Sequence, residues 1–281
     1  MDSHPRRTGR RFRARARRRG FARRLACSAA FAAALVPLLA LAARAATVEE
    51  SIAAGDSAYV RGDTRGANAA YDAALATRPD DFGALWRRAR LESEMGEDAT
   101  GDSQRKLERV AVGHARAAVK VAPDSALGHV WLAVTLGRQA LKEGPKTQLA
   151  LSREIKAEAD RAIAIDPTIG RAWHVLALWN RKVASLNFME RLAANSVLGG
   201  VPKGASMDNA VRDLEKAITL EPAYVNHHLE LGRTFIQMKR YPEARKELET
   251  ATSLKPTSNL RDPHYQMEAR ELMLRLPEAG R

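Results

Sequence analysis

The residues that could catalyse a reaction or bind a metal are six histidines after residue 45: His114, His129, His174, His227, His228 and His264. None belongs to an HExxH motif, and none has another histidine three or four residues away, the spacing that puts two ligands on one face of a helix. The only cysteine, Cys27, lies near the N-terminus, so the rest of the chain can form no disulfide and no cysteine-based metal site. Gly199-Gly200 precedes Val-Pro-Lys rather than the Lys-Ser/Thr of a phosphate-binding loop. These patterns predict that the protein is not an enzyme and that it binds no metal and no cofactor.

The elements that would position these side chains are indicated by a repeat that ends in proline. Between Pro222 and Pro256, 34 residues apart, His228-x2-Leu231-Gly232-x2-Phe235 is followed by Ala244-x3-Leu248-x2-Ala251. The first set predicts the apolar face of one helix, and the second predicts a facing helix whose small residues allow close approach. The period and the pattern of small and large residues are typical of a tetratricopeptide (TPR) helical hairpin.

The same register recurs upstream of this hairpin. Five prolines each follow an alanine by five positions, and these alanines are Ala74, Ala118, Ala162, Ala217 and Ala251. Because a single hairpin cannot bury its own apolar face, the hairpins must stack. The sequence therefore predicts an all-α protein, a right-handed α-solenoid of about five TPR hairpins over residues 46–281. The expected units are about 48–81, 82–125, 126–169, 170–224 and 225–258, followed by a C-terminal capping helix over 261–277.

The middle repeats are longer than the TPR period. The intervals between successive prolines are 44, 44, 55 and 34 residues, and the surplus falls between the two helices of each long hairpin. In the second unit the surplus contains Gly96, Asp98, Gly101 and Asp102, which predicts a flexible acidic loop. In the third unit, Gly144-Pro145 predicts a short turn between two lengthened helices. Insertions at equivalent places fall on one edge of a solenoid, where partners often bind.

The surplus of the fourth unit is apolar. Leu186, Phe188, Met189 and Leu192 precede Gly199-Gly200-Val201-Pro202, which predicts a short helix and then a loop. This insert, residues 186–202, could pack into the core of the solenoid. Alternatively, it could cover the groove of the solenoid or lie against a membrane surface, as amphipathic helices do.

The first 45 residues carry almost all of the net charge. They hold twelve arginines and one acid, whereas residues 46–281 carry 34 Lys+Arg against 32 Asp+Glu. The folded part therefore lacks the basic surface of a nucleic-acid-binding protein. An arginine-rich stretch, an apolar run over 25–42 and Ala43-Arg44-Ala45 predict a signal peptide cleaved near Ala45, and hence a periplasmic or secreted protein. The alternatives are an uncleaved membrane anchor through 25–42, which has nearly the length of a membrane span, and an organellar transit peptide.

The TPR register also predicts which side chains line the concave groove. These are Trp86, Arg90, Val130, Val134, Arg138, His174, Leu178, Arg181, Lys182, Leu229, Arg233 and Ile236. An apolar wall with a row of cations suits an extended peptide with acidic groups, or a lipid with an anionic head. Alternatively, the arginines pair with acids of neighbouring helices, where exposed pairs contribute about 0 to 1 kcal/mol each. His129 and His228 fall in the position that Trp173 fills in the fourth unit, which favours a structural role, and His227 is expected to face solvent.

Residues 84–91, Ala-Leu-Trp-Arg-Arg-Ala-Arg-Leu, and the irregular block that follows resemble the regulator of microtubule dynamics family. In the fourth unit, Met189-Glu190-Arg191-Leu192-Ala193, Pro202 and Ser206-x-Asp208-x-Ala210 stand where that family has a helix, a proline loop and the next helix start. The resemblance covers about residues 50–276. It implies a non-enzymatic adaptor that is often tethered to a membrane at its N-terminus. The export-type leader indicates a bacterial relative, so we carry over the fold and the adaptor class but not an action on microtubules.

Together these features predict an exported scaffold that binds a protein or peptide partner in its concave groove. The alternative is a lipid-binding or membrane-contact module in which the insert covers an apolar cavity. In that case the partner would be a phospholipid or a membrane surface.

Overall fold

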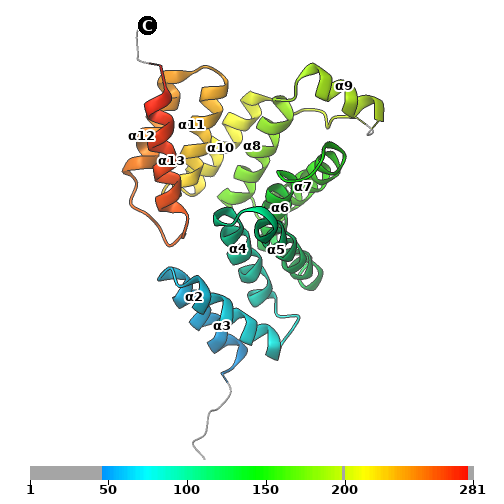
Figure 1. Cartoon of the computed structure of the whole chain (residues 1–281), viewed down its shortest axis with the longest axis vertical. Helices are drawn as coiled ribbons and strands as arrows, with labels where there is room; N and C mark the ends of the chain where they lie inside the picture. The colour runs from blue at the N-terminus through cyan, green and yellow to red at the C-terminus, as the bar shows by residue number, and fades with distance from the viewer. Residues whose placement is uncertain (1–45, 198–199, 278–281) are drawn as a thin grey trace, which may run out of the picture. The chain divides into compact units, whose positions relative to one another are not determined.

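The computed structural model describes residues 46–197 and 200–277, and they form an all-α solenoid as predicted (Figure 1). The first hairpin consists of α2 (Val48–Val60) and α3 (Thr64–Thr77), and the second of α4 (Phe82–Asp98) and α5 (Gly101–Val121). The third consists of α6 (Ala126–Ala140) and α7 (Pro145–Ile165). The fourth contains α8 (Gly170–Ala184), α9 (Phe188–Val197) and α10 (Met207–Leu220). The fifth contains α11 (Val225–Gln237) and α12 (Tyr241–Ser253), and α13 (Asp262–Arg275) follows as the cap.

Close packing within each hairpin depends on the small residues of the repeat. The five alanines that precede the repeat prolines are all fully buried. In the first hairpin a Cβ on Gly55 would lie 2.3 Å from Cε1 of Tyr71, and in the fifth a Cβ on Gly232 would lie 2.8 Å from the Leu248 side chain. These two glycines therefore make room for the large residue of the facing helix.

The second hairpin differs from the sequence prediction. Residues 96–98 belong to α4 and α5 begins at Gly101, so Ala99 and Thr100 alone connect the two helices. The expected flexible acidic loop is wrong. The surplus residues lengthen the helices to 17 and 21 residues instead, because Gly96 packs against Glu108 and continues the hairpin contact.

The insert of the fourth hairpin forms a short helix, as predicted, and residues 200–206 form a loop before α10, while residues 198 and 199 lie outside the described residues. Helix α9 begins with a reciprocal cap, in which the Glu190 backbone N–H donates to Asn187 at 2.9 Å and the Asn187 N–H donates to Glu190 at 2.8 Å. The Arg191 guanidinium donates to the carbonyls of Val183, Ala184 and Leu186 at the end of α8. These bonds hold α9 against the carboxyl end of α8, where a cation is favourable.

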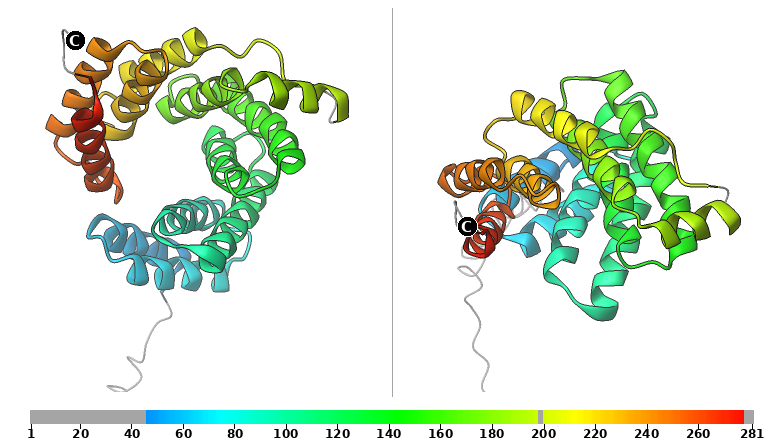
Figure 2. Two further views of the ribbon diagram at one scale, coloured as in Figure 1. Left: turned by 45° about the horizontal axis from the view of Figure 1, so that its top comes forward. Right: turned by 90° about the horizontal axis from the view of Figure 1, so that it is seen from above.

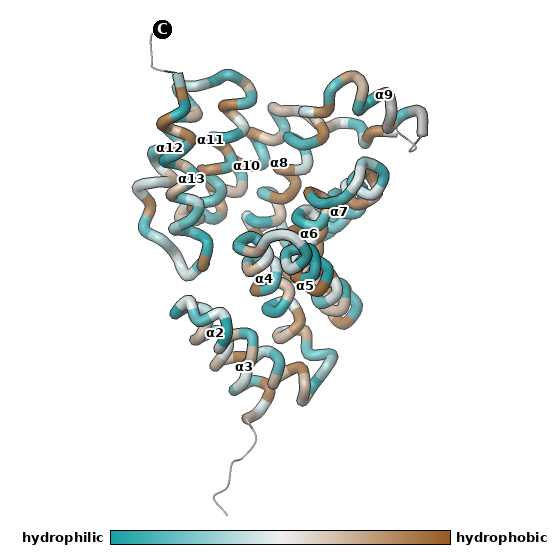
Figure 3. The backbone as a smooth tube through the Cα atoms, in the orientation of Figure 1, coloured by the Kyte–Doolittle hydropathy of each residue, from teal (hydrophilic) through white to brown (hydrophobic). Residues whose placement is uncertain are grey.

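Within residues 46–277 the hairpins follow an arc. The helices at its two ends, α2 and α13, both lie at the open side of the arc (Figure 2). Apolar and polar residues alternate along the helices, which is the pattern of amphipathic helices packed on one another (Figure 3). Among the described residues, no helix combines the length and apolar character that crossing a bilayer requires.

Candidate partner-binding site

The inner face of the arc is formed by the first helix of each hairpin and by α13. Helix α4 packs on α6, α6 on α8, α8 on α11, and α11 on α13. This face carries the predicted groove residues, so its side chains decide what a partner would meet.

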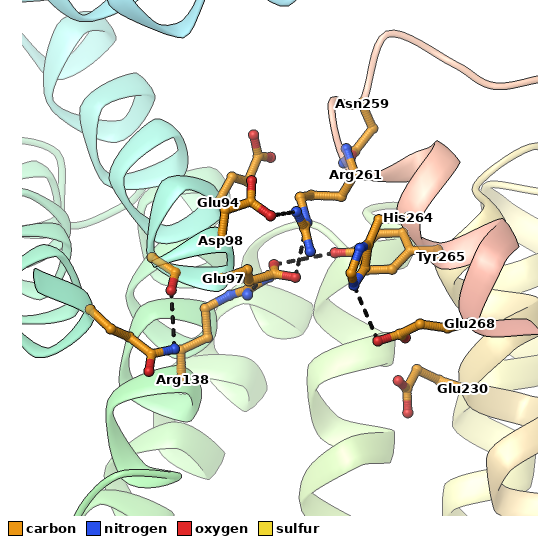
Figure 4. A network of polar contacts seen from close by, with 12 residues as sticks. Glu94, Glu97, Asp98, Arg138, Glu230, Asn259, Arg261, His264, Tyr265 and Glu268 are labelled. Atoms are coloured by element: carbon orange, nitrogen blue, oxygen red, sulfur yellow. Dashed lines mark hydrogen bonds and ion pairs between the residues drawn. The ribbon is translucent and has the colours of Figure 1, made fainter. Parts of the chain in front are cut away.

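The inner face is closed at one place by a cluster that joins the start of α13 to the second and third hairpins (Figure 4). Arg261, in the connection between α12 and α13, donates through Nε to Glu97 at 3.1 Å and pairs through Nη1 with Asp98. Arg138 of α6 pairs with the same Glu97, and the Tyr265 hydroxyl donates to it at 3.3 Å. We call these five residues the closing cluster. They join segments more than 160 residues apart, since Arg261 and Glu97 are separated by 164 positions.

A second charged cluster links α8, α11 and α13. Glu230 is buried between Arg181, which pairs with one of its oxygens, and Arg233, which donates to the other at 2.5 Å. Burial raises the pKa of Glu230, but the two guanidinium groups overcome this effect and hold the pKa at about 2. Arg233 also donates to Glu268 of α13 at 2.7 Å. Arg181 and Arg233, two of the four arginines predicted for the groove, are thus paired with acids of the protein itself.

Two histidines meet where α8 faces α11. The Nδ1 atoms of His174 and His227 lie 2.8 Å apart and both residues are buried, so one ring must donate and the other accept. Burial lowers the pKa of each histidine, and the neighbouring ring adds to the effect on His174. Around the pair, Glu221 lies 3.5 Å from Nε2 of His227 and the Tyr224 ring packs edge-on against His227. The expectation that His227 faces solvent is wrong, because the contact with His174 turns it into the protein.

Another buried carboxyl lies on α4, three residues before Glu97 of the closing cluster. Glu94 of α4 accepts hydrogen bonds from the Tyr59 hydroxyl at 2.8 and 3.0 Å. Burial raises its pKa to about 7, although Arg90, Arg138 and Arg171 act in the opposite direction. Arg90 stacks over the Tyr59 ring at 3.6 Å.

A pocket of about 260 Å³ opens beside the closing cluster. Its walls come from α4, α5, α6 and the start of α13, and its lining residues include Glu97, Gln104, Glu108, Arg138, Lys142, Arg261 and His264. Glu97, Arg138 and Arg261 satisfy one another within the closing cluster. The carboxyl of Glu108 and the ammonium of Lys142 form no hydrogen bond or ion pair with any described residue, and they are the charges left for a ligand.

The predicted groove residues fall into three groups. Trp86, Arg90, Arg138, His174, Arg181 and Arg233 do belong to the inner-face contacts described above or stack beside them. Val134, Leu178 and Ile236 are half-buried, and Lys182 is exposed. Val130 and Leu229 require a correction. Both are fully buried in the hydrophobic core, where they pack with residues of their own and of neighbouring hairpins, so their side chains cannot line a groove.

The insert residues are not brought together with the groove residues. Phe188 and Met189 are 75% and 67% exposed, Leu192 is 47% exposed, and Leu186 is half-buried. Figure 2 shows α9 projecting from the outer side of the arc, away from α13. This placement differs from the predicted cover over the groove, because the bonds of Arg191 tie α9 to the end of α8.

His129 and His228 have structural partners that repeat along the chain. Nε2 of His129 and of His228 lies 2.8 and 3.2 Å from the carbonyl of the proline six positions earlier, and Trp173 donates to the equivalent carbonyl at 2.9 Å. This equivalence confirms the structural interpretation of His129 and His228. Within the part of the chain that the structure describes, no group of His, Cys, Asp and Glu has the arrangement of a metal site.

Several residues of the inner face were missed by the sequence prediction. They are Glu94, Glu97, Glu108, Arg171, Tyr224, Arg261 and Tyr265. Most lie outside the helix positions that the TPR register assigns to the groove. Glu230 could have been found, because it stands three residues before Arg233 on the same helix.

Sequence comparisons match residues 52–277 to the model of the family described as regulator of microtubule dynamics protein 1-3. The regulator of microtubule dynamics protein 3 of Rattus norvegicus is 29% identical over 190 residues, which cover 67% of this chain and 40% of that protein. The regulator of microtubule dynamics protein 1 of Caenorhabditis elegans is 26% identical over 189 residues, covering 67% of this chain and 83% of that protein. The chain thus spans about two fifths of the length of the rat protein.

Among solved structures, a thermophilic TPR protein of Thermus thermophilus matches with a TM-score of 0.60 and 18% identity. The match covers 81% of this chain and 99% of the Thermus chain. At this identity the likeness shows a shared TPR fold.

Proposed function

Because the chain belongs to the regulator of microtubule dynamics family, we propose that it is a non-enzymatic, exported scaffold that holds a protein or peptide partner at its inner face. The TPR fold supports a role in protein interaction, since stacked helical hairpins present extended concave surfaces. The observation that carries the proposal is the pocket beside the closing cluster. It is bounded by four helices and retains unpaired charges, whereas the groove arginines Arg138, Arg181 and Arg233 are paired internally.

Export is supported by the leader and by where the compact unit begins. The unit of residues 46–281 starts directly after the expected cleavage site at Ala45. Helix α2 brings its own reciprocal cap, in which Thr47 and Glu50 bond each other's backbone N–H at 2.8 and 3.1 Å. Cleavage after Ala45 would therefore remove no residue of this unit. N-terminal sequencing of the protein from a bacterial host should begin near Ala46, and a product that keeps the leader and stays in the membrane fraction would establish the anchor instead.

The partner site can be tested by photo-crosslinking in the full chain. A benzoylphenylalanine at Leu141, which is exposed at the rim of the pocket, should capture a discrete partner in the host cell. The same probe at Thr219, exposed on α10, serves as the control. Capture at Thr219 but not at Leu141 would move the partner to another face, and capture at neither position would refute the scaffold proposal.

Membrane contact through α9 is a second candidate, favoured by the exposure of Phe188 and Met189. Exposed apolar side chains on a short, fixed helix can enter the interfacial region of a bilayer. Flotation of the full chain with phospholipid vesicles tests it. Flotation that Phe188→Asp leaves unchanged would remove α9 from any such role.

A further inference from the structure

Glu108 has no internal contact that explains its place beside the closing cluster. The residue lies on α5, is only 4% exposed, and lines the pocket beside the closing cluster. No described residue lies within hydrogen-bonding or ion-pairing distance of its carboxyl, whose oxygens stay accessible from the pocket although the residue as a whole is buried. Burial raises the pKa of the Glu108 carboxyl, which agrees with the absence of a close cation.

The pocket offers several acceptors on one wall. Gln104 precedes Glu108 by four residues on α5, so the two side chains stand on the same face of the helix. The Gln104 amide nitrogen donates to the Gly96 carbonyl at 3.0 Å, which fixes the amide and leaves its oxygen available. Two carboxylate oxygens and one amide oxygen match the three N–H donors of a primary ammonium group.

Lys142 is the cation of the pocket that a bound ammonium group would compete with for Glu108. It is exposed at the rim of the pocket, and its charge acts on Glu108 without forming an ion pair. The other charged residues of the pocket are already paired: Glu97 with Arg138 and Arg261, and Glu268 with Arg233. Among the acids that line this pocket, Glu108 therefore has no internal counter-ion. A cation for it must come from Lys142 or from a ligand.

We propose that this pocket binds a primary ammonium group of the partner, with Glu108 and Gln104 as the acceptors. The inference rests on the proposed scaffold function and names the chemistry of the group that the scaffold recognises. A lysine side chain and the free N-terminus of a chain both carry this group. Lys142 is a competitor for Glu108 rather than part of the recognition.

The test uses ligand-observed saturation-transfer NMR with the full chain and three probes. The probes are triglycine amide with a free N-terminus, Nα-acetyl-lysine amide, and N-acetyl-triglycine amide, which lacks an ammonium group. At least one ammonium probe should bind, and the acetylated glycine probe should not. Binding of the first probe alone assigns the site to a chain N-terminus, and binding of the second alone assigns it to a lysine side chain.

Two variants give effects of opposite sign. Glu108→Gln, which keeps the shape of the side chain, should weaken binding of the ammonium probe by about tenfold or more, because a charge-assisted hydrogen bond is lost. Lys142→Met should strengthen binding of the same probe several-fold, because it removes the cation that competes for Glu108. The control Glu215→Gln, at an exposed position on α10, should leave binding of the ammonium probe unchanged.

Three results would overturn the inference: equal binding of the acetylated glycine probe, binding unaffected by Glu108→Gln, or no binding by either ammonium probe. A circular dichroism spectrum equal to that of the unaltered protein establishes that each variant is folded. The photo-crosslinking experiment at Leu141 does not depend on these probes. Partner capture there with no ammonium binding would therefore refute the pocket chemistry and keep the scaffold.

Discussion

The contact between His174 and His227 predicts an acid-sensitive packing of the fourth hairpin on the fifth. Both rings are buried, and burial lowers the pKa of each below the ordinary value of 6.5. As the pH falls below that value, the unfolded chain binds protons that the folded protein does not. The free energy of unfolding must therefore decrease as the pH falls toward the folded-state pKa of each ring.

The magnitude follows from the geometry. Each histidine that stays neutral in the folded protein removes about 1.4 kcal/mol per pH unit below about pH 6.5. Between about pH 6.5 and pH 5, His174 alone accounts for up to about 2 kcal/mol. Glu94 acts in the opposite sense, because its pKa is raised by burial to about 7, and the folded protein takes up its proton first as the pH falls. The stability curve of the unaltered protein therefore mixes opposing contributions, and the prediction is made for a difference between variants.

The variant is His174→Gln, whose amide can still hydrogen-bond to His227. At about pH 7.5 it should be less stable than the unaltered protein, by about 1 to 3 kcal/mol for a disturbed buried hydrogen bond. That deficit should shrink by up to about 2 kcal/mol at about pH 5, because the variant no longer carries the buried His174. Urea unfolding followed by circular dichroism measures both values. His264→Gln, which removes a partly exposed histidine, serves as the control and should show no such change. A deficit that stays constant from about pH 7.5 to pH 5 would refute the assignment of a neutral buried pair.

Three further changes test the fold and the closing cluster. Arg261→Met should lower the free energy of unfolding by about 2 kcal/mol, because the ion pairs of Arg261 with Glu97 and Asp98 are lost. The loss is limited because Glu97 keeps Arg138 and the exposed Asp98 returns to water. The control Arg275→Met, at an exposed position, should lower it by less than about 1 kcal/mol. Gly55→Ala should destabilise by about 1 to 3 kcal/mol through its collision with Tyr71, and Gly113→Ala, in open space on α5, should stabilise by up to about 1 kcal/mol. Phe188→Asp should leave the unfolding free energy within about 0.5 kcal/mol, and a larger loss would mean that α9 packs as core. Urea unfolding measures all of these values.

The repeat made most of the fold predictable. The alanine that precedes each repeat proline, and the large residues that face Gly55 and Gly232, report contacts within one hairpin, and such contacts recur at fixed sequence spacing. The length of α4 was not predictable from Gly96, because its contacts with Leu107 and Glu108 of the facing helix overrode the local turn preference of glycine, whereas Gly101 keeps a positive φ where α5 begins.

The inner face was predictable only in part, because its decisive contacts join distant segments. Arg261 and Glu97 have no sequence relation that a repeat could reveal, and their pairing depends on how far the arc curves. The same holds for His227. The sequence predicts that it faces solvent, because it lies next to His228 and points to a different side of the same helix. Its partner His174 comes from the preceding hairpin and lies 53 positions away.

The internal pairing of the inner face limits how a partner can bind there. An acidic peptide that bound Arg138 or Arg181 would first have to displace Glu97 or Glu230, and would leave Glu97 with Arg261 alone or Glu230 with Arg233 alone. The peptide would therefore exchange an internal ion pair for a new one, and an ion pair at an exposed rim contributes only about 0 to 1 kcal/mol. A cationic group that approaches Glu108 displaces no internal partner and supplies the one that the carboxyl lacks. The physical chemistry of this face therefore favours a basic over an acidic partner group, which is opposite to the expectation from the row of cations in the sequence.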